Sequence, residues 1–505
     1  MLRAKSVSWV VAPVLPALLL AAYPLLSLFE QNQSELPLSV IWSPLVVMSA
    51  AIVVLYAVLV RVLRDARKAG VLTAVAVLFF FYLDTFHSDV AGLHLSDGSA
   101  LVIWLALCGT VGVLLARMNS SVGTVLVGVG VAAAVLALVP ALRVASYQRR
   151  HPAVSASDPR LWPTPLTPSA KPRSRPDIYV IIPDDYARGD VLKRYFHYDN
   201  AAFVRALKHR GLTLSDQARS PYSDSESNIT AELNMGYLTG LPKILGPKSQ
   251  DVRPLKTLME DNRAAQLAKS LGYRYHHMDT DEVMFSGGNP AISPVGVPDS
   301  FQSLWLRKSV LRVFGGPIGF NESAGDQRFR DTVRSGFKRL DHVISQPGPK
   351  LVAFHTLIPH DPYIFGARGQ SVTFPSQSDD VIHSRLGMRY YLPQVRYVER
   401  RLLSTVDQIR AHSRTPPVIV LMSDEGFEGG STFSEAVTRD IRVKGLLAYS
   451  VPGLRHPAGP RPPSTVNTLR WVFNQVWGTR YPMLPAVSSP DGDYPYQWEP
   501  FKVAK

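Results

Sequence analysis

The chain has 505 residues, which is too long for one ordinary domain and predicts at least two structural units. Apolar residues make up 46% of the sequence, and the long apolar runs are concentrated in its N-terminal third. The formal net charge of +14 would favour nucleic acid as the partner of a soluble protein, so its meaning depends on whether the chain is soluble.

Five apolar stretches near the N-terminus predict transmembrane helices. A helix needs about 20 apolar residues to cross the hydrocarbon core of a bilayer, and these stretches reach or approach that length. The first could instead be a signal peptide, but we interpret it as a retained helix because no small-residue cleavage site stands out before Glu30. Residues 1–145 are therefore predicted to be a transmembrane anchor of five helices: Val10–Phe29, Leu38–Val60, Val71–Phe86, Ala100–Leu115 and Val122–Val139.

The basic residues of the short loops predict how these helices are oriented. Lys and Arg precede the first stretch and follow the second and fourth, whereas the loops 30–35 and 87–97 contain neither. Because positive charge stays on the cytoplasmic side, the N-terminus is expected inside and the rest of the chain outside. We therefore expect a multi-pass protein of a bacterial-type plasma membrane. Its positive charge then favours the lipid bilayer or a phosphate-bearing substrate as partner, and not nucleic acid.

A Pro- and Arg-rich segment, residues 146–176, follows the last apolar stretch. Such a composition predicts a semi-extended juxtamembrane linker. The remaining residues, 177–505, are predicted to form the extracytoplasmic domain. The sole cysteine, Cys108, lies in the fourth apolar stretch, so this domain has no disulfide and must be held together by its own core.

The extracytoplasmic domain has the pattern of an α/β fold. Three short apolar runs predict buried parallel strands: Ile178–Ile182, Leu351–Phe354 and Val418–Met422. Helical patterns occur in the sequence between these runs: Asn200–Arg210, Gln327–Ser345 and Arg389–Ala411. The alternation predicts a mostly parallel sheet flanked by helices on both faces.

Each of the three predicted strands is followed by side chains that bind metals. Ligands bind at the carboxyl ends of the strands in open α/β sheets, where these side chains would meet. Carboxylate oxygens and imidazole nitrogens are ligands of Zn²⁺ and Mn²⁺. A single Asp after a strand would be an ordinary turn or cap residue, but the same ending on three strands favours a metal site. The residues concerned are Asp184, Asp185, His355, His360, Asp424 and Glu425.

A hydroxyl-rich segment, Ser220–Asn228, precedes the helical run Ile229–Leu238. A hydroxyl at a helix N-terminus lies where free N–H groups favour an anion such as a phosphoryl group. A neighbouring metal would also lower the pKa of the hydroxyl and make it a nucleophile. On these residues alone, a plain helix cap is the preferred interpretation.

Four segments together resemble the membrane-bound sulfatase-like proteins related to lipoteichoic acid synthase, in the alkaline phosphatase superfamily. The segments are Asp177–Tyr186, Arg219–Leu238, His355–Tyr363 and Pro417–Gly426. The resemblance implies that Asp184, Ser225, Asp424 and Glu425 bind one divalent metal, with Asp185 as a further ligand. It also implies that Ser225 is the nucleophile and that His360 contacts the substrate or the leaving group. The family usually has His at the position of Glu425, and this oxygen ligand favours Mn²⁺ over Zn²⁺, Mg²⁺ or Ca²⁺.

The function implied by the resemblance is that of a metal-dependent phosphotransferase or phosphodiesterase with a seryl-phosphate intermediate. Its donor would be a membrane phospholipid headgroup, and its acceptor an envelope glycan or glycolipid. Since the extracytoplasmic domain has no Cys, the glycerolphosphate-transfer branch or a phosphodiesterase is favoured over the disulfide-rich phosphoethanolamine transferases. The alternative is a sulfatase-fold envelope protein that has lost catalysis and acts in binding or envelope organisation, and Glu425 is the residue that supports it.

Overall fold

The computed structural model describes residues 12–89, 95–118, 122–162, 172, 174–278, 300–314, 322–375, 378–429, 432–453, 462, 464–489, 492 and 494–498. The chain divides into two compact units. The first, here called the helical unit, comprises Met1–Pro152 and Ser286–Gly325. The second, here called the sheet unit, comprises Ala153–Phe285 and Asp326–Lys505.

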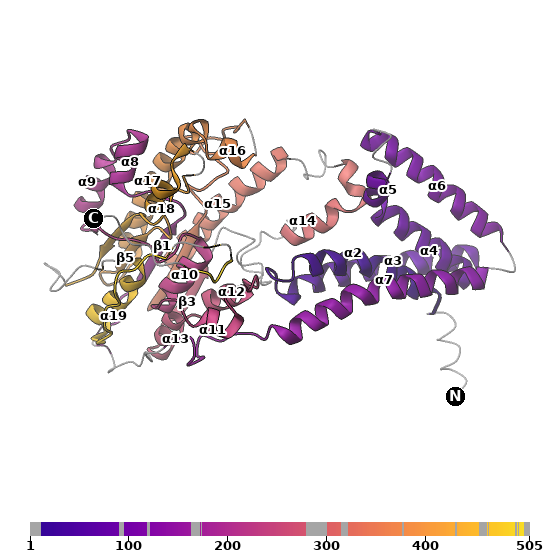
Figure 1. Ribbon diagram of the computed structural model, residues 1–505, viewed down its shortest axis with the longest axis horizontal. Coiled ribbons are helices and arrows are strands. Elements are labelled where there is room, and N and C mark those ends of the chain that lie inside the picture. Colours follow the sequence, from indigo (N-terminus) through magenta and orange to yellow (C-terminus); the bar gives the residue numbers. More distant parts are fainter. Residues whose placement is uncertain are drawn as a thin grey trace. The chain divides into compact units, whose positions relative to one another are not determined.

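The helical unit contains the apolar N-terminal part of the chain (Figure 1). Its N-terminal helices are α2 (Leu15–Gln31), α3 (Trp42–Leu63), α4 (Ala66–Phe81), α5 (Leu83–Asp89), α6 (Asp97–Arg117) and α7 (Val122–Arg150), with the short 3₁₀ turns η1 (Ala12–Val14) and η2 (Leu38–Ile41). Large apolar side chains are exposed along α3, α6 and α7, as expected of helices that face hydrocarbon.

Four helical segments among the described residues are long and apolar enough to cross a membrane: Ala12–Gln31, Leu38–Leu63, Asp97–Arg117 and Val122–Arg150. The prediction of five spans is therefore not confirmed. The third predicted span, Val71–Phe86, coincides with the 16-residue α4 and the start of α5. Asp65 caps α4 by accepting hydrogen bonds from the backbone N–H groups of Arg67 and Lys68. Because Arg67 and Lys68 lie in the first turn, this end of the short helix is charged.

The sheet unit is built on one six-stranded sheet with the order β2-β6-β5-β1-β4-β3. The strands are β1 (Ile178–Pro183), β2 (Thr213–Leu214), β3 (Arg274–Met278), β4 (Lys350–Thr356), β5 (Val418–Met422) and β6 (Leu447–Ser450). The three predicted strands are the three adjacent central ones, β5, β1 and β4. The pairings β1–β4, β1–β5 and β3–β4 are parallel, but β5–β6 and β2–β6 are antiparallel. The sheet is mixed, and the prediction of a mostly parallel sheet is not confirmed.

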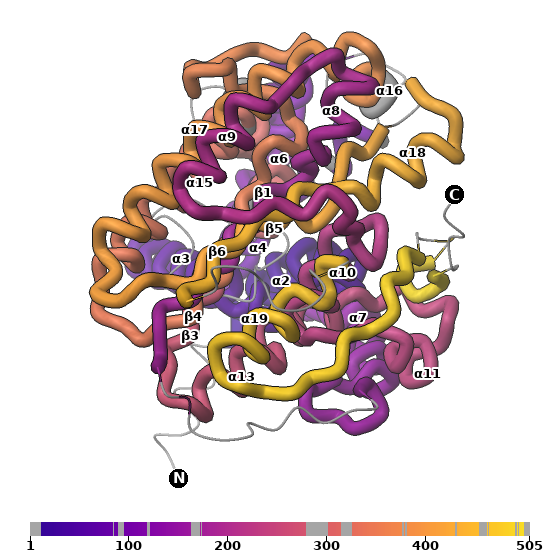
Figure 2. Tube along the Cα trace, turned by 90° about the vertical axis from the view of Figure 1, so that its left-hand side faces the viewer, coloured from indigo at the N-terminus to yellow at the C-terminus, as the bar shows by residue number. Residues whose placement is uncertain are grey.

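Helices cover both faces of the sheet (Figure 2). One face packs against α8 (Gly189–Phe196), α9 (Ala201–His209), α15 (Glu322–Ser345), α17 (Arg385–His412) and α18 (Glu435–Arg442). The other packs against α10 (Ser225–Asn234), α12 (Arg253–Glu260), α13 (Arg263–Ser270) and α19 (Thr468–Trp477). The remaining short elements are α11 (Leu241–Leu245), α16 (Asp379–Ile382) and η6 (Thr465–Asn467).

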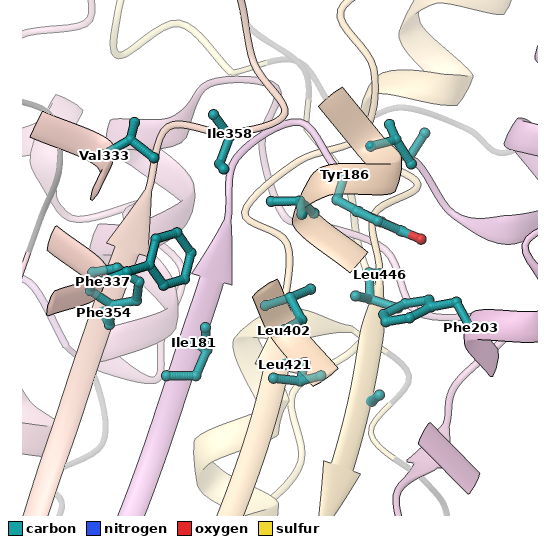
Figure 3. Packing of buried hydrophobic residues seen from close by; sticks show 14 of the residues in the cluster. Ile181, Tyr186, Phe203, Val333, Phe337, Phe354, Ile358, Leu402, Leu421 and Leu446 are labelled. Atoms are coloured by element: carbon teal, nitrogen blue, oxygen red, sulfur yellow. The ribbon is translucent and has the colours of Figure 1, made fainter. Parts of the chain in front are cut away.

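The alternation of side chains along β1 explains why both faces are covered. Tyr179 and Ile181 belong to the core on one face, and Ile178, Val180 and Ile182 to the core on the other. Figure 3 shows the first core, with strand residues such as Ile181 and Leu421 facing helix residues such as Phe337 and Leu402. A strand that is apolar on both sides has to be covered on both faces of the sheet, because either side would otherwise meet water.

The structure describes part of the segment that is predicted to be a linker. Residues 146–150 continue α7, and Val154, Ala156, Leu161 and Trp162 are buried in the sheet unit. The Trp162 ring lies 5.2 Å from the guanidinium of Arg263 and its indole N–H donates to the carbonyl of Ala156 at 2.9 Å. The apolar side chains of 153–162 therefore attach this part of the segment to the domain, which composition alone did not predict.

A buried ion pair lies at the amino end of the central strands. Lys350 Nζ is 3.0 Å from Asp177 Oδ2, and Lys350 is 1% exposed. Asp177→Ala would leave the ammonium buried without its carboxylate, so we expect it to lower the free energy of unfolding by about 3 kcal/mol in urea titrations. The matched control is Lys193→Ala, which removes an exposed pair with Asp199 at 3.5 Å, and a change of about 0.5 kcal/mol or less is expected there. Equal effects of the two substitutions would contradict this role of Asp177.

Candidate metal centre and nucleophile

The carboxyl ends of β1, β4 and β5 bring the predicted site residues to one edge of the sheet. Because β4 and β5 both run parallel to β1, the residues that follow them leave the sheet side by side. The backbone N–H of Asp184 donates to the carbonyl of Thr356 at 2.9 Å, which ties β1 to β4. Ser423 Oγ donates to the carbonyl of Pro183 at 2.7 Å, which ties β5 to β1. These two hydrogen bonds hold the strand ends together without any ligand.

Two overlapping groups of ligand atoms lie at this edge. His355 Nε2 is 3.4 Å from Asp184 Oδ2 and 3.7 Å from Asp424 Oδ2, and none of the three side chains is more than 2% exposed. Asp184, Asp185 and Glu425 also place one oxygen each within 4.8 Å of the others. We call these five residues the acidic cluster.

The acidic cluster has the properties expected of a cation site. Asp424 Oδ2 and Asp185 Oδ1 are buried and have no hydrogen-bond partner among the described residues. Burial, together with the neighbouring charge of Asp184, raises the pKa of Asp424 to about 7. Burial also raises the pKa of Glu425 well above its ordinary value. Buried carboxylates that repel one another fit a divalent cation, which would neutralise them and satisfy the free oxygens.

Ser225 is the first residue of α10, and its hydroxyl points to the acidic cluster. It lies 3.4 Å from Asp184 Oδ1 and 3.4 Å from Glu425 Oε1, as donor to both. The cap of α10 is instead Asp224, whose side chain accepts from the backbone N–H of Ser227 at 2.7 Å. The plain-cap interpretation of Ser225 is therefore replaced, because a neighbouring residue does the capping and leaves the Ser225 hydroxyl at the site.

His360 lies beside the acidic cluster on the loop that follows β4. An atom of His360 lies within 4.8 Å of ligand atoms of Asp185 and Glu428. Gln394 Nε2 holds the loop by donating to the carbonyl of His360 at 2.6 Å. Burial lowers the pKa of His360, but the carboxylates of Asp184, Asp185 and Asp361 outweigh it and raise the pKa well above its ordinary value. His360 is thus cationic near neutral pH.

Three further residues complete the site and were not predicted. Arg442 Nε is 3.2 Å from Glu425 Oε2, and Arg442 Nη1 is 3.1 Å from Glu428 Oε1. His383 Nε2 is 3.0 Å from Glu428 Oε2, and the hydrogen bond from His383 is the main reason why the pKa of Glu428 falls to about 2. Glu428 follows Glu425 closely in the sequence, but Arg442 and His383 come from separate segments with no spacing that would indicate the contact. His355, one of the side chains predicted at the strand ends, lies beside Asp184 and Asp424, although the family resemblance implied no role for it.

Arg442 supports the ionised form of Glu425, and its removal gives a testable result. Without the guanidinium the pKa of Glu425 would rise further, so Arg442→Ala is expected to weaken Mn²⁺ binding about 10- to 100-fold near pH 7 and less at higher pH. Calorimetric titration at several pH values measures this. Arg439→Ala is the control: this residue lies on the same helix and pairs with the exposed Glu435, so its loss is expected to change the affinity by about twofold or less. A pH-independent loss for Arg442→Ala would contradict the proposed role.

No family model matches this sequence, and no curated protein is similar to it in sequence. Comparison with solved structures finds phosphoethanolamine transferases and sulfatases. The integral membrane lipooligosaccharide phosphoethanolamine transferase A from Neisseria meningitidis is 10% identical, with 92% of this chain and 95% of that chain covered and a TM-score of 0.38. The periplasmic domain of EptC from Escherichia coli, in complex with Zn, is 14% identical, with 62% and 84% covered and a TM-score of 0.38.

The sulfatase BT1596, a 2-O GAG sulfatase, is 14% identical, with 64% of this chain and 79% of that chain covered and a TM-score of 0.41. Because each of these TM-scores is below 0.5, the function of this chain has to be inferred from its own site.

Proposed function

We propose that this protein is a metal-dependent phosphotransferase or phosphodiesterase that acts on phosphoesters of membrane phospholipids or envelope glycans through a seryl-phosphate intermediate. The observation that carries the proposal is the position of Ser225. Its hydroxyl lies at a helix N-terminus, 3.4 Å from two carboxylates of a buried acidic cluster. This arrangement combines a nucleophile, proton acceptors and a place for a cation.

The residues of the cluster have distinct proton affinities, which suggests a role for each. Burial favours the protonated form of Asp184, but the charges of His360 and His355 outweigh it and lower the pKa of Asp184, so Asp184 stays ionised. Arg442 pairs with Oε2 of Glu425 and favours its ionised form, while Oε1 accepts from the Ser225 hydroxyl, so Glu425 is the proposed proton acceptor for Ser225. The cationic His360 is suited to protonate a leaving alcohol.

In the first step Ser225 Oγ forms a bond to the headgroup phosphorus while its proton passes to Glu425. The bond from phosphorus to the glycerol oxygen breaks, and the departing diacylglycerol oxygen takes a proton from His360. In the second step an acceptor hydroxyl or water gives its proton to His360 and attacks the phosphoserine. The bond to Ser225 Oγ breaks, and the proton on Glu425 returns to the serine.

The cation would be held by Asp184, Ser225, Asp424 and Glu425, with Asp185 and His355 as further ligands. When bound, a divalent metal lowers the pKa of the attacking hydroxyl and stabilises charge on the phosphoryl oxygens. The predominance of carboxylate oxygens supports Mn²⁺ over Zn²⁺, although a single imidazole makes both worth testing. The donor proposed is a phospholipid headgroup, because the helical unit has membrane-capable helices in the same chain. The acceptor proposed is an envelope glycan or glycolipid.

The proposal is tested by incubating the full-length protein with phospholipid vesicles and Mn²⁺ and measuring diacylglycerol. Diacylglycerol release that depends on the metal and increases with a glycan acceptor would support a transferase. Metal-dependent release of diacylglycerol without an acceptor would support a phosphodiesterase. A protein that binds Mn²⁺ but releases no diacylglycerol from phosphatidylglycerol or phosphatidylethanolamine would contradict the phospholipid donor.

Metal binding is expected to strengthen with pH. Below the pKa of about 7 a proton occupies Asp424 and competes with the cation, so the affinity for Mn²⁺ should rise about fivefold from pH 6 to 7. Because the pKa of Glu425 is also raised, the affinity should continue to rise above pH 7. Calorimetry in buffers of different ionisation enthalpy counts the protons that are released. If the affinity is independent of pH and no proton is released, the metal does not displace a proton from Asp424.

One observation favours a second candidate, a sulfatase-fold envelope protein without catalysis. The ion pair with Arg442 at 3.2 Å neutralises Glu425 without any metal. If the ion pair between Arg442 and Glu425 replaced the metal, the sheet unit would act in binding or in envelope organisation. Absence of Mn²⁺ and Zn²⁺ binding by the purified protein would favour this candidate.

A further inference from the structure

A segment of the chain between two strands of the sheet belongs to the helical unit. Residues Ser286–Gly325 lie between β3 and β4 in the sequence, but they group with the N-terminal helices. Their described part includes α14 (Ser300–Arg307), the 3₁₀ turn η4 (Val310–Phe314) and the first residues of α15. Figure 1 shows α14, coloured as residues near 300, beside the much earlier helices of this unit. The chain thus leaves the sheet unit, contributes to the helical unit and returns.

Two aromatic residues attach α14 to the helices. Phe301 is 1% exposed and packs edge-on against Phe29, with ring centroids 6.4 Å apart. Trp305, one turn later on the same face, lies 5.4 Å from the ring of Phe81. Both aromatic residues belong to the apolar core of the helical unit. Their partners lie towards the C-terminal ends of α2 and α4.

A polar anchor attaches η4 to the same end of the helices. Arg312 Nη2 lies 2.8 Å from Asp97 Oδ1 and 2.5 Å from His87 Nδ1. Val310 is buried with Leu83 and Ala100 in a small core of its own. His87 and Asp97 belong to the loop without Lys or Arg, which the charge pattern assigns to the outer side of the membrane. A segment of an extracytoplasmic domain could meet the helices only at that side.

The exposed surface of this segment includes two large apolar side chains. Leu304 is 46% exposed and Phe314 is 47% exposed. Among the described residues of the sheet unit, only Leu386 and Val487 are large apolar side chains with comparable exposure, whereas such side chains are common in the helical unit. Leu304 and Phe314 therefore follow the pattern of the surface that faces lipid. Arg307, three residues after Leu304, is also exposed and would reach phosphate groups.

We propose that α14 and η4 form an interfacial element that lies in the outer leaflet of the bilayer. Its aromatic face and Arg312 bind the outer ends of the membrane helices. Leu304 and Phe314 enter the boundary between headgroups and acyl chains, and Arg307 contacts lipid phosphates. The element gives the sheet unit an attachment to the membrane besides α7. The proposal is independent of catalysis and of any metal.

Fluorescent labelling of single cysteines tests the lipid contact. In a Cys108→Ser background, Leu304→Cys and Phe314→Cys are labelled with a polarity-sensitive dye, and the full-length protein is reconstituted into vesicles of phosphatidylethanolamine and phosphatidylglycerol. Leu386→Cys and Val487→Cys are matched controls, since they are similarly exposed apolar residues of the sheet unit. Nitroxide groups on the lipids are expected to quench the fluorescence of dyes at positions 304 and 314 about threefold or more strongly than at the control positions. Iodide in the water is expected to quench the dyes at positions 304 and 314 less than at the control positions.

A second measurement tests the docking itself. In the same background, Asp97→Cys with Arg312→Cys is expected to be cross-linked within one chain by a bismaleimide reagent in membranes, because the reagent replaces the length of the arginine side chain. Asp97→Cys with Arg64→Cys is not expected to be cross-linked, since Arg64 follows α3 at the other end of the helices, where Lys68 Nζ donates to the carbonyl of Ala116 near the end of α6. The proposal is overturned if positions 304 and 314 are as accessible to iodide as the controls, or if the 97–312 cross-link fails to form. Neither readout requires enzymatic activity, so failure here is distinguishable from failure of the proposed function.

Discussion

Ser225→Ala is expected to lower the rate of diacylglycerol release about 1000-fold or more, because the substitution removes the nucleophile and leaves only binding and electrostatic contributions. The protein should still fold, since Asp224 and not Ser225 caps α10. Binding of Mn²⁺ should weaken but persist, because the carboxylates of the acidic cluster remain. Rates are measured with phospholipid vesicles at saturating metal, and folding is checked by thermal unfolding.

Ser227→Ala is the matched control for this substitution. Ser227 lies on the same helix, is 1% exposed and has a hydroxyl that is bonded to none of the described residues. Its loss should leave the rate within about twofold of the unmodified protein. If both variants retained activity, or both lost it, the assignment of the nucleophile to Ser225 would be wrong.

Asp424→Asn is expected to weaken Mn²⁺ binding by about 100-fold or more, given that loss of groups which merely orient metal ligands already costs 10- to 100-fold. The metal-free protein should not become less stable. Asp424 is fully buried beside Asp184, and the repulsion between them is part of why its pKa rises to about 7. Asparagine removes this repulsion and keeps the shape of the side chain.

The measurement is the unfolding temperature with and without Mn²⁺. The unmodified protein should gain stability on metal addition, by about 2.7 kcal/mol at a hundred times the dissociation constant, and Asp424→Asn should gain much less. Asp407→Asn, which alters an exposed pair with Arg210, should respond to the metal like the unmodified protein. A metal response of Asp424→Asn equal to that of Asp407→Asn would exclude Asp424 as a ligand.

The central strands and the carboxylates that follow them could be predicted from the sequence because both depend on local signals. β1, β4 and β5 contain runs of buried apolar residues, and Asp184 and Asp424 follow two of them directly. β6 reads Leu-Ala-Tyr-Ser and β2 has only two residues, so neither has the apolar run of a central strand. The antiparallel edge of the sheet, which these two strands form, was not predicted for this reason.

The features that the sequence did not predict depend on contacts between segments that are distant along the chain. Arg442 reaches Glu425 from the end of α18, and no spacing in the sequence indicates that the two meet. The partners of Phe301 and Trp305 lie in the N-terminal helices, although both residues stand between strands of the sheet unit. A pattern of residue types along the chain does not contain such pairings, since they depend on the tertiary fold. The resemblance of the motifs identified the candidate nucleophile, which the cap pattern alone would have rejected.

The central claim is that Ser225 becomes phosphorylated by a lipid headgroup. It is tested most directly by incubating the full-length protein with Mn²⁺ and a phospholipid that carries an isotopic label in its headgroup, quenching in acid and analysing the peptides by mass spectrometry. We expect a labelled headgroup phosphoryl group on the peptide that contains Ser225, absent from the Ser225→Ala variant and present in Ser227→Ala. Release of diacylglycerol with no adduct on Ser225, or with an adduct on another residue, would contradict the account.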